Sequence, residues 1–402
     1  MDVPEKLETL VAGAEFDVCG YNRGTSLQHP GSHPLRFIHR AALPGGGSVY
    51  LFKVLLTNVC VNDCAYCANQ IGRDCRRTSF RPQELAKLFM ELHTKRLVQG
   101  LFLSSGIAGN ASQTMESMVK TVEIVRGHYG FKGYIHLKIL PGAAFDCVEE
   151  GCKLASRVSV NMEAPTAQHL AMLSSKKDLH RDILERMRWV RQLIATDERL
   201  VPSGQTTQFV VGAAGESDLD LLHTTDALYR DMGLRRVYFS AFRPISDSPL
   251  EGLRPTPPLR EHRLYQADWL LREYGFSFQE IELALGKRGN LPLTKDPKLA
   301  IAQKQPWLFP VDVNAASYNE LLRVPGIGPV SARKIMEARK EHSISSLEQI
   351  RKMGIATKRA APFIWLRGMS AWQKQLSFLP QLDDDSSQQV SSLADVVGSP
   401  RN

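Results

Sequence analysis

The chain has 402 residues, 43% of them hydrophobic, which is enough to bury a large core and, at typical domain sizes, predicts two or three domains. The sequence contains no run of roughly 18 apolar residues, so we expect no membrane span and a soluble, cytoplasmic protein. The formal charge of +8 favours polyanionic partners such as nucleic acid, although net charge governs association and solubility rather than fold.

Residues 1–48 contain one amphipathic stretch and are otherwise rich in Gly, Pro, His and Asn, so we expect them to form a leader that caps the following domain. From residue 49 onward, short β-branched or aromatic runs alternate with longer stretches of helical period. The predicted strands are 49–56, 101–104, 134–139, 157–160, 205–211 and 236–242. The predicted helices are 5–14, 82–97, 112–128, 144–152, 178–195, 218–232 and 260–273.

Strict alternation of strand and helix predicts a parallel sheet that is covered by helices and joined by right-handed connections. Six such units over 49–275 are too few for a closed eight-stranded barrel, so a partial barrel and an open doubly wound sheet both fit the pattern. In either fold, ligands bind at the carboxyl ends of the strands. The residues that follow each predicted strand are therefore the first candidates for a site.

Three of the seven cysteines, Cys60, Cys64 and Cys67, follow the first predicted strand in the pattern CxxxCxxC. An odd number of cysteines with three in one cluster is typical of a metal site in a reducing compartment rather than of a disulfide framework. Three thiolates on one short loop can each hold one iron of a four-iron cluster and leave the fourth iron open for another ligand.

The cysteine triplet has two competing explanations. One is a structural zinc ion with Cys75 as the fourth thiolate, but zinc sites usually use two CxxC-type pairs, and the sequence has no second pair. The other is ordinary burial, which rarely places three cysteines within eight loop positions. Spacing and placement therefore favour an iron-sulfur cluster.

With Tyr66 directly before the last cysteine, the motif resembles the signature of the radical S-adenosylmethionine (SAM) superfamily. The resemblance implies a partial (β/α)6 TIM-type barrel, a [4Fe-4S] cluster held by the three cysteines, and SAM chelated to the fourth iron. In that family an external low-potential electron donor drives SAM cleavage, and the resulting 5′-deoxyadenosyl radical abstracts a substrate hydrogen. The resemblance thus implies an enzyme and assigns no catalytic residue beyond the cluster.

The resemblance also places SAM-binding residues at the strand ends. Ser104, Ser105 and Gly106 occupy the place of the glycine-rich motif that meets the methionyl amine, although they depart from its usual Gly-Gly-Glu form. The full implied cofactor-binding set is Tyr66, Ser104, Ser105, Gly106, Asn161, Glu163, Gly212, Glu216 and Ser240. Just past the cysteines, the arginines of 73–77 are suited to a phosphate or to the SAM carboxylate.

Residues 276–311 carry scattered Gly and Pro with little periodicity, and we expect a connector that wraps the first domain. The composition then shifts, because 312–367 contains ten Lys or Arg against five Asp or Glu, and its helical segments are separated by short Gly-containing turns. The predicted domain at 312–372 is small and all-α, and a Ser-, Gln- and Asp-rich tail at 383–402 is predicted to be disordered.

The segment 320–335 allows a helix up to Val324, a tight turn at the glycines and a new helix opened by Pro329. Backbone N–H groups at such a turn form a small anion site. The segment resembles a helix-hairpin-helix motif, and 347–360 resembles a second, poorer copy. The implied DNA-binding residues are Gly326, Ile327, Gly328, Ser331, Arg333, Lys334, Lys358 and Arg359.

The cysteine motif and the hairpins together resemble a group of radical SAM proteins with a carboxyl-terminal helix-hairpin-helix domain. That group is assigned to DNA modification or repair and is associated with a partner related to uracil-DNA glycosylases. Our lead hypothesis is therefore a radical SAM enzyme acting on DNA. The alternatives are an RNA-modifying radical SAM enzyme and a nucleic-acid-binding protein whose cluster is structural or redox-sensing.

Overall fold

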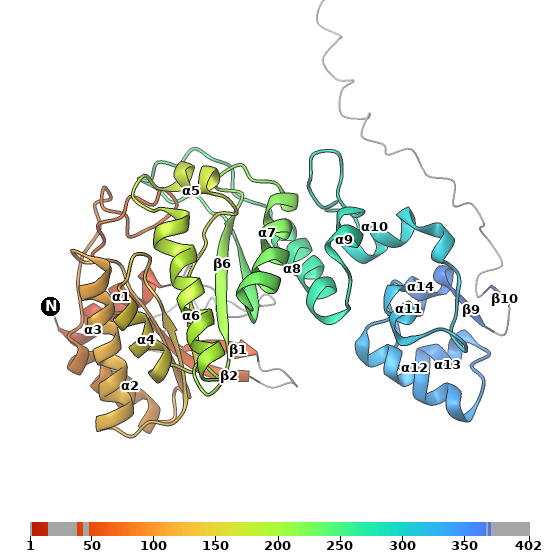
Figure 1. Cartoon of the computed structure of the whole chain (residues 1–402), viewed down its shortest axis with the longest axis horizontal. Coiled ribbons are helices and arrows are strands. Elements are labelled where there is room, and N and C mark those ends of the chain that lie inside the picture. The colour runs from red at the N-terminus through yellow and green to blue at the C-terminus, as the bar shows by residue number, and fades with distance from the viewer. Residues whose placement is uncertain (1, 15–37, 43–47, 367–368, 371–402) are drawn as a thin grey trace, which may run out of the picture. The chain divides into compact units, whose positions relative to one another are not determined.

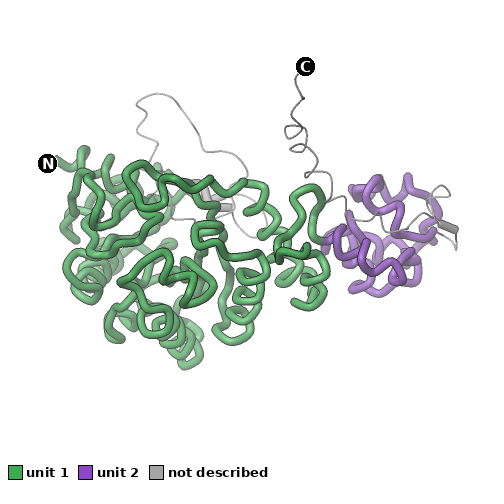
Figure 2. Tube along the Cα trace, turned by 90° about the horizontal axis from the view of Figure 1, so that it is seen from above, with its two compact units in different colours: residues 1–297 green, residues 298–402 purple. Residues whose placement is uncertain are grey.

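The computed structural model describes residues 2–14, 38–42, 48–366 and 369–370. These residues separate into two compact units, 1–297 and 298–402, which Figure 2 colours differently. Most of the predicted leader and all of the predicted tail at 383–402 lie outside the described residues. None of the described helices is long and apolar enough to cross a membrane.

The first unit is built on a seven-stranded sheet whose strands follow one another in the order of the chain, from β1 to β7. Strands β2 to β7 pair in parallel, and β1 adds an antiparallel edge beside β2. Each parallel strand lies beside its predecessor, which is the order of a barrel and differs from the switched order of a doubly wound sheet. The expected partial barrel is therefore confirmed.

The six predicted strands all form, with ends that differ by at most one residue. Strand β1 was not predicted, because its five residues lie in the leader with no periodic neighbours. The strands of this sheet are β1 (Ile38–Ala42), β2 (Ser48–Leu55), β3 (Gly100–Ser104), β4 (Tyr134–Lys138), β5 (Arg157–Ser159), β6 (Gln205–Val211) and β7 (Arg236–Ala241).

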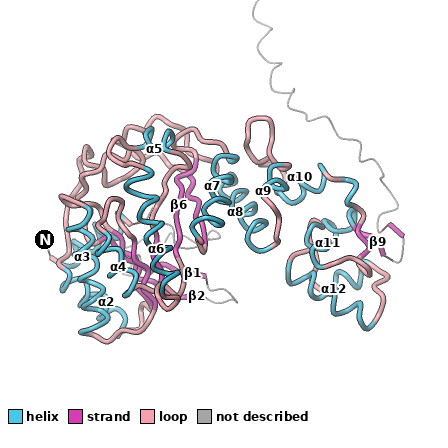
Figure 3. Tube along the Cα trace, in the orientation of Figure 1, coloured by secondary structure: helices cyan, strands magenta, loops and turns pink. Residues whose placement is uncertain are grey.

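Helices surround the strands, as Figures 1 and 3 show. Local sequence sets their ends: α7 begins at a capping box of Ser217 with Asp220 and ends at Gly233, whose φ of 60° is left-handed. Two predicted helices contain a π-helical turn, η2 (Ile124–His128) and η3 (Leu179–Leu184). The α-helices are α1 (Val3–Gly13), α2 (Pro82–Thr94), α3 (Ala111–Glu123), α4 (Phe145–Leu154), α5 (Ala167–Leu173), α6 (Glu185–Thr196), α7 (Asp218–Met232), α8 (Pro258–Glu273) and α9 (Phe278–Glu282).

The second unit contains short helices and a three-stranded sheet in the order β10-β9-β8, which the all-α expectation did not include. Its strands have two or three residues each, too few to produce a period in the sequence. The elements are α10 (Pro297–Lys304), η4 (Pro306–Leu308), β8 (Val311–Asp312), α11 (Tyr318–Arg323), α12 (Pro329–Glu341), α13 (Leu347–Lys352), α14 (Thr357–Ala360), η5 (Ala361–Phe363), β9 (Ile364–Leu366) and β10 (Met369–Ser370). The predicted connector at 276–311 thus contains α9, α10 and η4, and its part from residue 298 belongs to the second unit.

Candidate cofactor site

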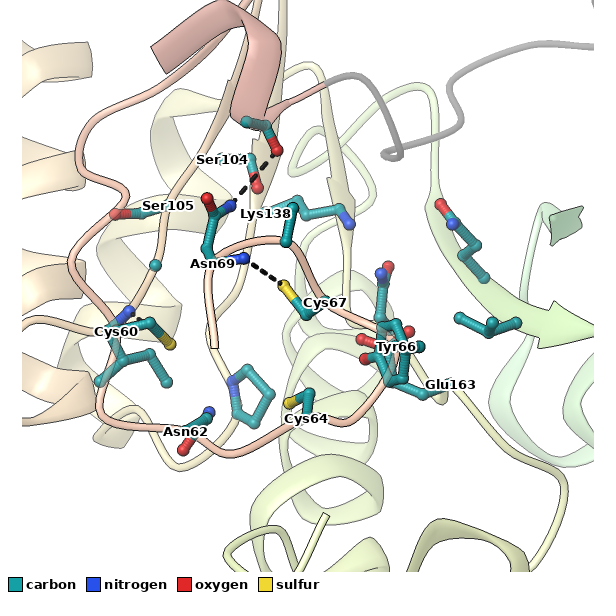
Figure 4. A pocket seen from close by; sticks show the side chains of 18 of the residues that line it. Cys60, Asn62, Cys64, Tyr66, Cys67, Asn69, Ser104, Ser105, Lys138 and Glu163 are labelled. Atoms are coloured by element: carbon teal, nitrogen blue, oxygen red, sulfur yellow. Dashed lines mark hydrogen bonds between the residues drawn. The ribbon is translucent and has the colours of Figure 1, made fainter. Parts of the chain in front are cut away.

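The cysteine loop follows β2 and lines a pocket at the carboxyl ends of the strands. Cys60, Cys64 and Cys67 all line this pocket, and Figure 4 shows their sulfur atoms turned toward a common space. Two backbone N–H groups donate to the sulfurs, from Ile107 to Cys60 Sγ at 3.5 Å and from Asn69 to Cys67 Sγ at 3.4 Å. Such bonds stabilise thiolates and tune the potential of an iron-sulfur cluster.

Two thiols of this loop, those of Cys64 and Cys67, are held in a setting that disfavours their ionised form. Burial, together with the neighbouring cysteines, raises the pKa of Cys67 to about 12. Burial also raises the pKa of Cys64, although the nearby Lys177 ammonium opposes the shift. A bound metal centre supplies the positive charge that would convert these thiols to thiolates.

The zinc hypothesis requires Cys75 as the fourth thiolate. Its thiol donates to the Ala68 carbonyl at 3.8 Å, and it is absent from the described residues that line the pocket. In the described part of the chain, no three His, Cys, Asp or Glu side chains are gathered so that they could hold one metal ion. The three cysteines of the CxxxCxxC pattern are the thiols that line the pocket.

One flank of the cysteine loop is fastened by Arg77. Its guanidinium donates to the carbonyl oxygens of Asn58 at 2.6 Å, Asn69 at 2.8 Å, Gln70 at 2.5 Å and Arg73 at 3.1 Å. These carbonyls lie on both sides of the three cysteines in sequence. Arg77 therefore ties the two ends of the loop together and does not present its fork to a ligand, unlike the expectation for 73–77.

The middle of the loop is fastened by the segment after α5. The Asp63 carboxylate accepts hydrogen bonds from the Ser174 and Ser175 hydroxyls, both at 2.5 Å, and Lys176 Nζ donates to the Val61 carbonyl at 2.6 Å. Burial alone would raise the pKa of Asp63, but the hydrogen bonds from Ser174 and Ser175 lower it to about 2. The carboxylate therefore contributes stability above an ordinary pKa of about 4, and this contribution is lost as the pH falls toward 2.

The loop after β3 approaches the cysteine loop at backbone distance. Gly106 N–H donates to the Thr57 carbonyl at 2.7 Å, and a Cβ at Gly106 would lie 2.4 Å from the Val59 carbonyl oxygen. Only glycine fits here without moving one of the two loops. Beside it, Ser104 and Ser105 line the pocket, and Ser105 Oγ is buried with no hydrogen-bond partner in the structure.

Strand β5 brings Asn161 and Glu163 to the same pocket. Asn161 Oδ1 is buried without a hydrogen-bond partner, so a polar ligand would satisfy it. Glu163 has a φ of 65°, which is unusual for a residue with a side chain and typical of functional positions. Ser240, at the end of β7, also lines the pocket.

Lys177 is a pocket residue that the sequence analysis missed. Its ammonium lies 3.5 Å from Glu163 Oε1 and 3.5 Å from Tyr66 Oη, and both charged side chains are 8% exposed. Burial opposes its charge, but Cys64 and Glu163 raise the pKa of Lys177 above its ordinary value. Lys177 lies 111 positions from Tyr66, so no local pattern in the sequence could have joined them.

Gly212 and Glu216 do not belong to the described lining of the pocket. The Glu216 carboxylate instead accepts the N–H groups of Gly212 and, at 3.2 Å, of Ala214. Gly212 has a φ of 88°, and a Cβ there would meet Thr256 Oγ1 at 2.0 Å. In this structure the two residues shape the turn after β6.

The second unit contains the first hairpin as a turn between α11 and α12. Gly326 has a φ of 89°, Ile327 is 1% exposed, and Lys298 Nζ donates to the Ile327 carbonyl at 2.5 Å. Gly328 caps α12 without a side-chain hydrogen bond, which leaves the N–H groups of the first turn to other acceptors. Ser331 and the exposed Arg333 follow on α12.

The two predicted hairpins are in contact. Lys334 Nζ donates to the Met353 carbonyl at 2.9 Å, at the start of the second turn. A Cβ at Gly326 would lie 3.0 Å from the Arg359 Cβ, which places α14 against the first turn. Lys358 and Arg359 are exposed on α14, so five of the eight predicted DNA-binding residues carry polar side chains on the helices that follow these two turns.

Comparison with known families identifies the region of both hairpins independently of these contacts. Residues 310–363 match the family model described as a helix-hairpin-helix motif. No curated protein matches the chain.

Several solved structures are similar to the chain over about half of its length. One is HydG, a maturase of the [FeFe]-hydrogenase, with 12% identity, a TM-score of 0.42, and coverage of 54% of this chain and 48% of that chain. Methylornithine synthase (PylB) has 15% identity, a TM-score of 0.43, and coverage of 56% and 62%. The radical S-adenosylmethionine methyltransferase TsrM from Kitasatospora setae, with cobalamin and [4Fe-4S] cluster bound, has 15% identity, a TM-score of 0.37, and coverage of 50% and 38%.

Proposed function

We propose that the chain is a radical SAM enzyme that acts on DNA. The observation that carries the proposal is the convergence of Cys60, Cys64 and Cys67, in the CxxxCxxC pattern, on one pocket at the carboxyl end of a parallel partial barrel. Buried thiols with N–H donors on two sulfurs suit the thiolate ligands of a low-potential cluster.

In this proposal, the three cysteines hold a [4Fe-4S] cluster, and neighbouring side chains hold SAM. When bound, the cluster and SAM together supply a 5′-deoxyadenosyl radical that removes a hydrogen atom from the substrate. Ser105 and Asn161 are suited to polar groups of SAM because each has a buried oxygen without a partner. In a cofactor enzyme of this kind the protein supplies binding, orientation and electrostatics around the cofactor.

The second unit is proposed to hold the nucleic acid. Two adjoining hairpin turns, with no side-chain cap at the start of α12 and exposed basic residues on α12 and α14, suit the phosphate backbone. A base has to be extruded or single-stranded to enter a pocket within a barrel. An external low-potential electron donor and a partner related to uracil-DNA glycosylases complete the proposal.

The test is anaerobic reconstitution of the full chain with iron and sulfide, followed by measurement of 5′-deoxyadenosine under a strong reductant, with and without DNA. We expect SAM cleavage that increases with DNA. A cluster that forms without any SAM cleavage would support a structural or redox-sensing cluster instead. Greater stimulation of SAM cleavage by single-stranded RNA than by DNA would support an RNA-modifying enzyme instead.

The hairpin role leads to a separate prediction. Replacing Gly326 with valine is expected to weaken duplex binding about tenfold, or about 1.4 kcal/mol, because a side chain at a φ of 89° displaces the turn and its N–H groups. Fluorescence anisotropy with labelled DNA at several salt concentrations measures this effect. The matched control is Gly252→Val, where nothing lies within 4 Å of the added Cβ. The cluster absorbance should be the same in both variants, and unchanged DNA binding by Gly326→Val would reject the hairpin assignment.

A further inference from the structure

The interior of the barrel carries a basic group of side chains that the proposed function does not use. Because Leu55, Ser104, Lys138, Gln208 and Ser240 all line the pocket, strand alternation turns every second residue of β2 to β7 inward. The same alternation turns five further polar residues into the interior below the pocket. These residues are Lys53, His136, Arg157, Thr206 and Arg236.

The inward positions of the described strands β2 to β7 carry basic side chains and no acidic ones. Lysine, histidine or arginine occupies inward positions on β2, β4, β5 and β7, whereas none of the inward positions of these six described strands is an aspartate or glutamate. Lys53 is 7% exposed, His136 is 2% exposed and Lys138 is 8% exposed. Gathering like charges inside a protein is costly unless an opposite charge accompanies them.

The lower part of this interior is arranged around Tyr238. Arg157 Nη1 donates to Tyr238 Oη at 3.4 Å, and the Arg236 guanidinium lies 4.9 Å from the centre of the Tyr238 ring. Strand register places Arg157 beside His136 and Arg236 beside Thr206. Two guanidinium groups therefore contact one aromatic side chain in the interior of the barrel.

Two polar atoms of this interior have no hydrogen-bond partner in the structure. Arg236 Nε and Thr206 Oγ1 are both buried without a hydrogen bond, and the Thr206 side chain is fully buried. Buried polar atoms are rarely left unsatisfied, and a guanidinium Nε is one half of the fork that binds oxyanions. Arg236 Nε can only donate, so its missing partner is an acceptor, and the Thr206 hydroxyl can donate to the same group.

His136 and His39 lie near these positively charged side chains. Burial, followed by the charges of Arg157 and Lys138, lowers the pKa of His136 well below its ordinary value. Burial and the charge of Lys53 lower the pKa of His39, on β1, to about 4. Both imidazoles therefore stay neutral at physiological pH, mainly because they are buried, and the positive neighbours add to the shift.

We infer that the barrel interior binds a phosphate group, with Arg157, Arg236 and Thr206 as its donors. Guanidinium forks match the geometry of phosphate, and a threonine hydroxyl adds a neutral donor. Two sources of that phosphate have the same chemistry: a free mononucleotide, and a nucleotide of a nucleic-acid strand that enters the pocket. The choice of nucleotides as ligands rests on the proposed function, whereas the phosphate site itself does not.

The site is tested with the full chain in its iron-free form, by isothermal titration calorimetry. The three probes are inorganic phosphate, 2′-deoxyadenosine 5′-monophosphate, and a single-stranded oligonucleotide with a 5′-phosphate. We expect at least one nucleotide probe to bind, and Arg236→Met to weaken it about tenfold, which is typical of one lost charge-assisted hydrogen bond. Arg236→Lys should recover part of the loss because it keeps the charge but not the fork.

Two further variants separate binding from folding. Thr206→Ala removes only the unpartnered hydroxyl and is expected to weaken binding about threefold with an unchanged melting temperature. Arg188→Met, on the exposed face of α6, is the matched control and should bind like the wild type. Failure of all three probes to bind the wild type, or equal binding by the wild type, Arg236→Met and Thr206→Ala, would overturn the inference. Since no iron or SAM is involved, binding without any SAM cleavage would sustain this site while rejecting the proposed function.

Discussion

Replacing Gly106 with alanine is expected to prevent the cysteine loop from retaining a cluster. The added Cβ would lie 2.4 Å from the Val59 carbonyl oxygen, the residue directly before Cys60, and both atoms belong to backbone that cannot turn aside. Forced repacking of this kind costs about 1–3 kcal/mol, and every 1.4 kcal/mol is about tenfold in an equilibrium constant. We therefore expect bound iron and sulfide after reconstitution to fall at least about tenfold.

Gly72→Ala is the matched control, because it makes the same change near the cysteine loop where nothing lies within 4 Å of the new Cβ. Iron and sulfide content, together with the electron paramagnetic resonance spectrum of the reduced cluster, should be normal in that variant. Circular dichroism should show that both variants fold. A Gly106→Ala protein with full iron content and an unchanged spectrum would contradict this prediction, because it would show that the cysteine loop and the loop after β3 can move apart without loss of the cluster.

The strands and helices of the barrel were predicted well because their signal is local. Each parallel strand is a short buried run, as in β3, where all five residues are buried, and each helix has its own caps. The order of the strands in the sheet could not be predicted from the sequence, because alternating strands and helices fit a barrel and an open sheet equally. The short strands β8 to β10 were missed because two or three residues carry no period.

Part of the pocket could be predicted from the rule that ligands bind at the carboxyl ends of parallel strands. That rule, with the family resemblance, led to the cysteines, to Ser104 and to Glu163, which the fold brings together. It could not exclude Glu216, because whether a carboxylate faces a ligand or caps its own turn depends on side-chain direction. Lys177 and Arg77 were not assigned their roles because their contacts join segments that only the folded chain places side by side.

Arg77 is the second residue for which we expect a large effect. In Arg77→Met, the carbonyls of Asn58, Asn69, Gln70 and Arg73 lose a shared donor, and each buried acceptor left unpaired costs about 1–3 kcal/mol. The loop ends would then separate before any metal binds. We expect faster amide hydrogen exchange over residues 58–73 in the iron-free protein, and loss of bound iron of about tenfold or more after reconstitution.

Arg76→Met is the matched control, because that side chain is 57% exposed and its ion pair with Glu5, at 3.1 Å, is a surface contact. Its exchange rates and iron content should equal those of the wild type. Arg77→Lys should recover little, since a single ammonium cannot reach four carbonyls that a planar guanidinium spans. If exchange over 58–73 is unchanged in Arg77→Met, the loop is ordered by the Asp63 contacts alone. If exchange rises while iron content is retained, the cluster itself orders the loop, and Arg77 acts only on the empty site.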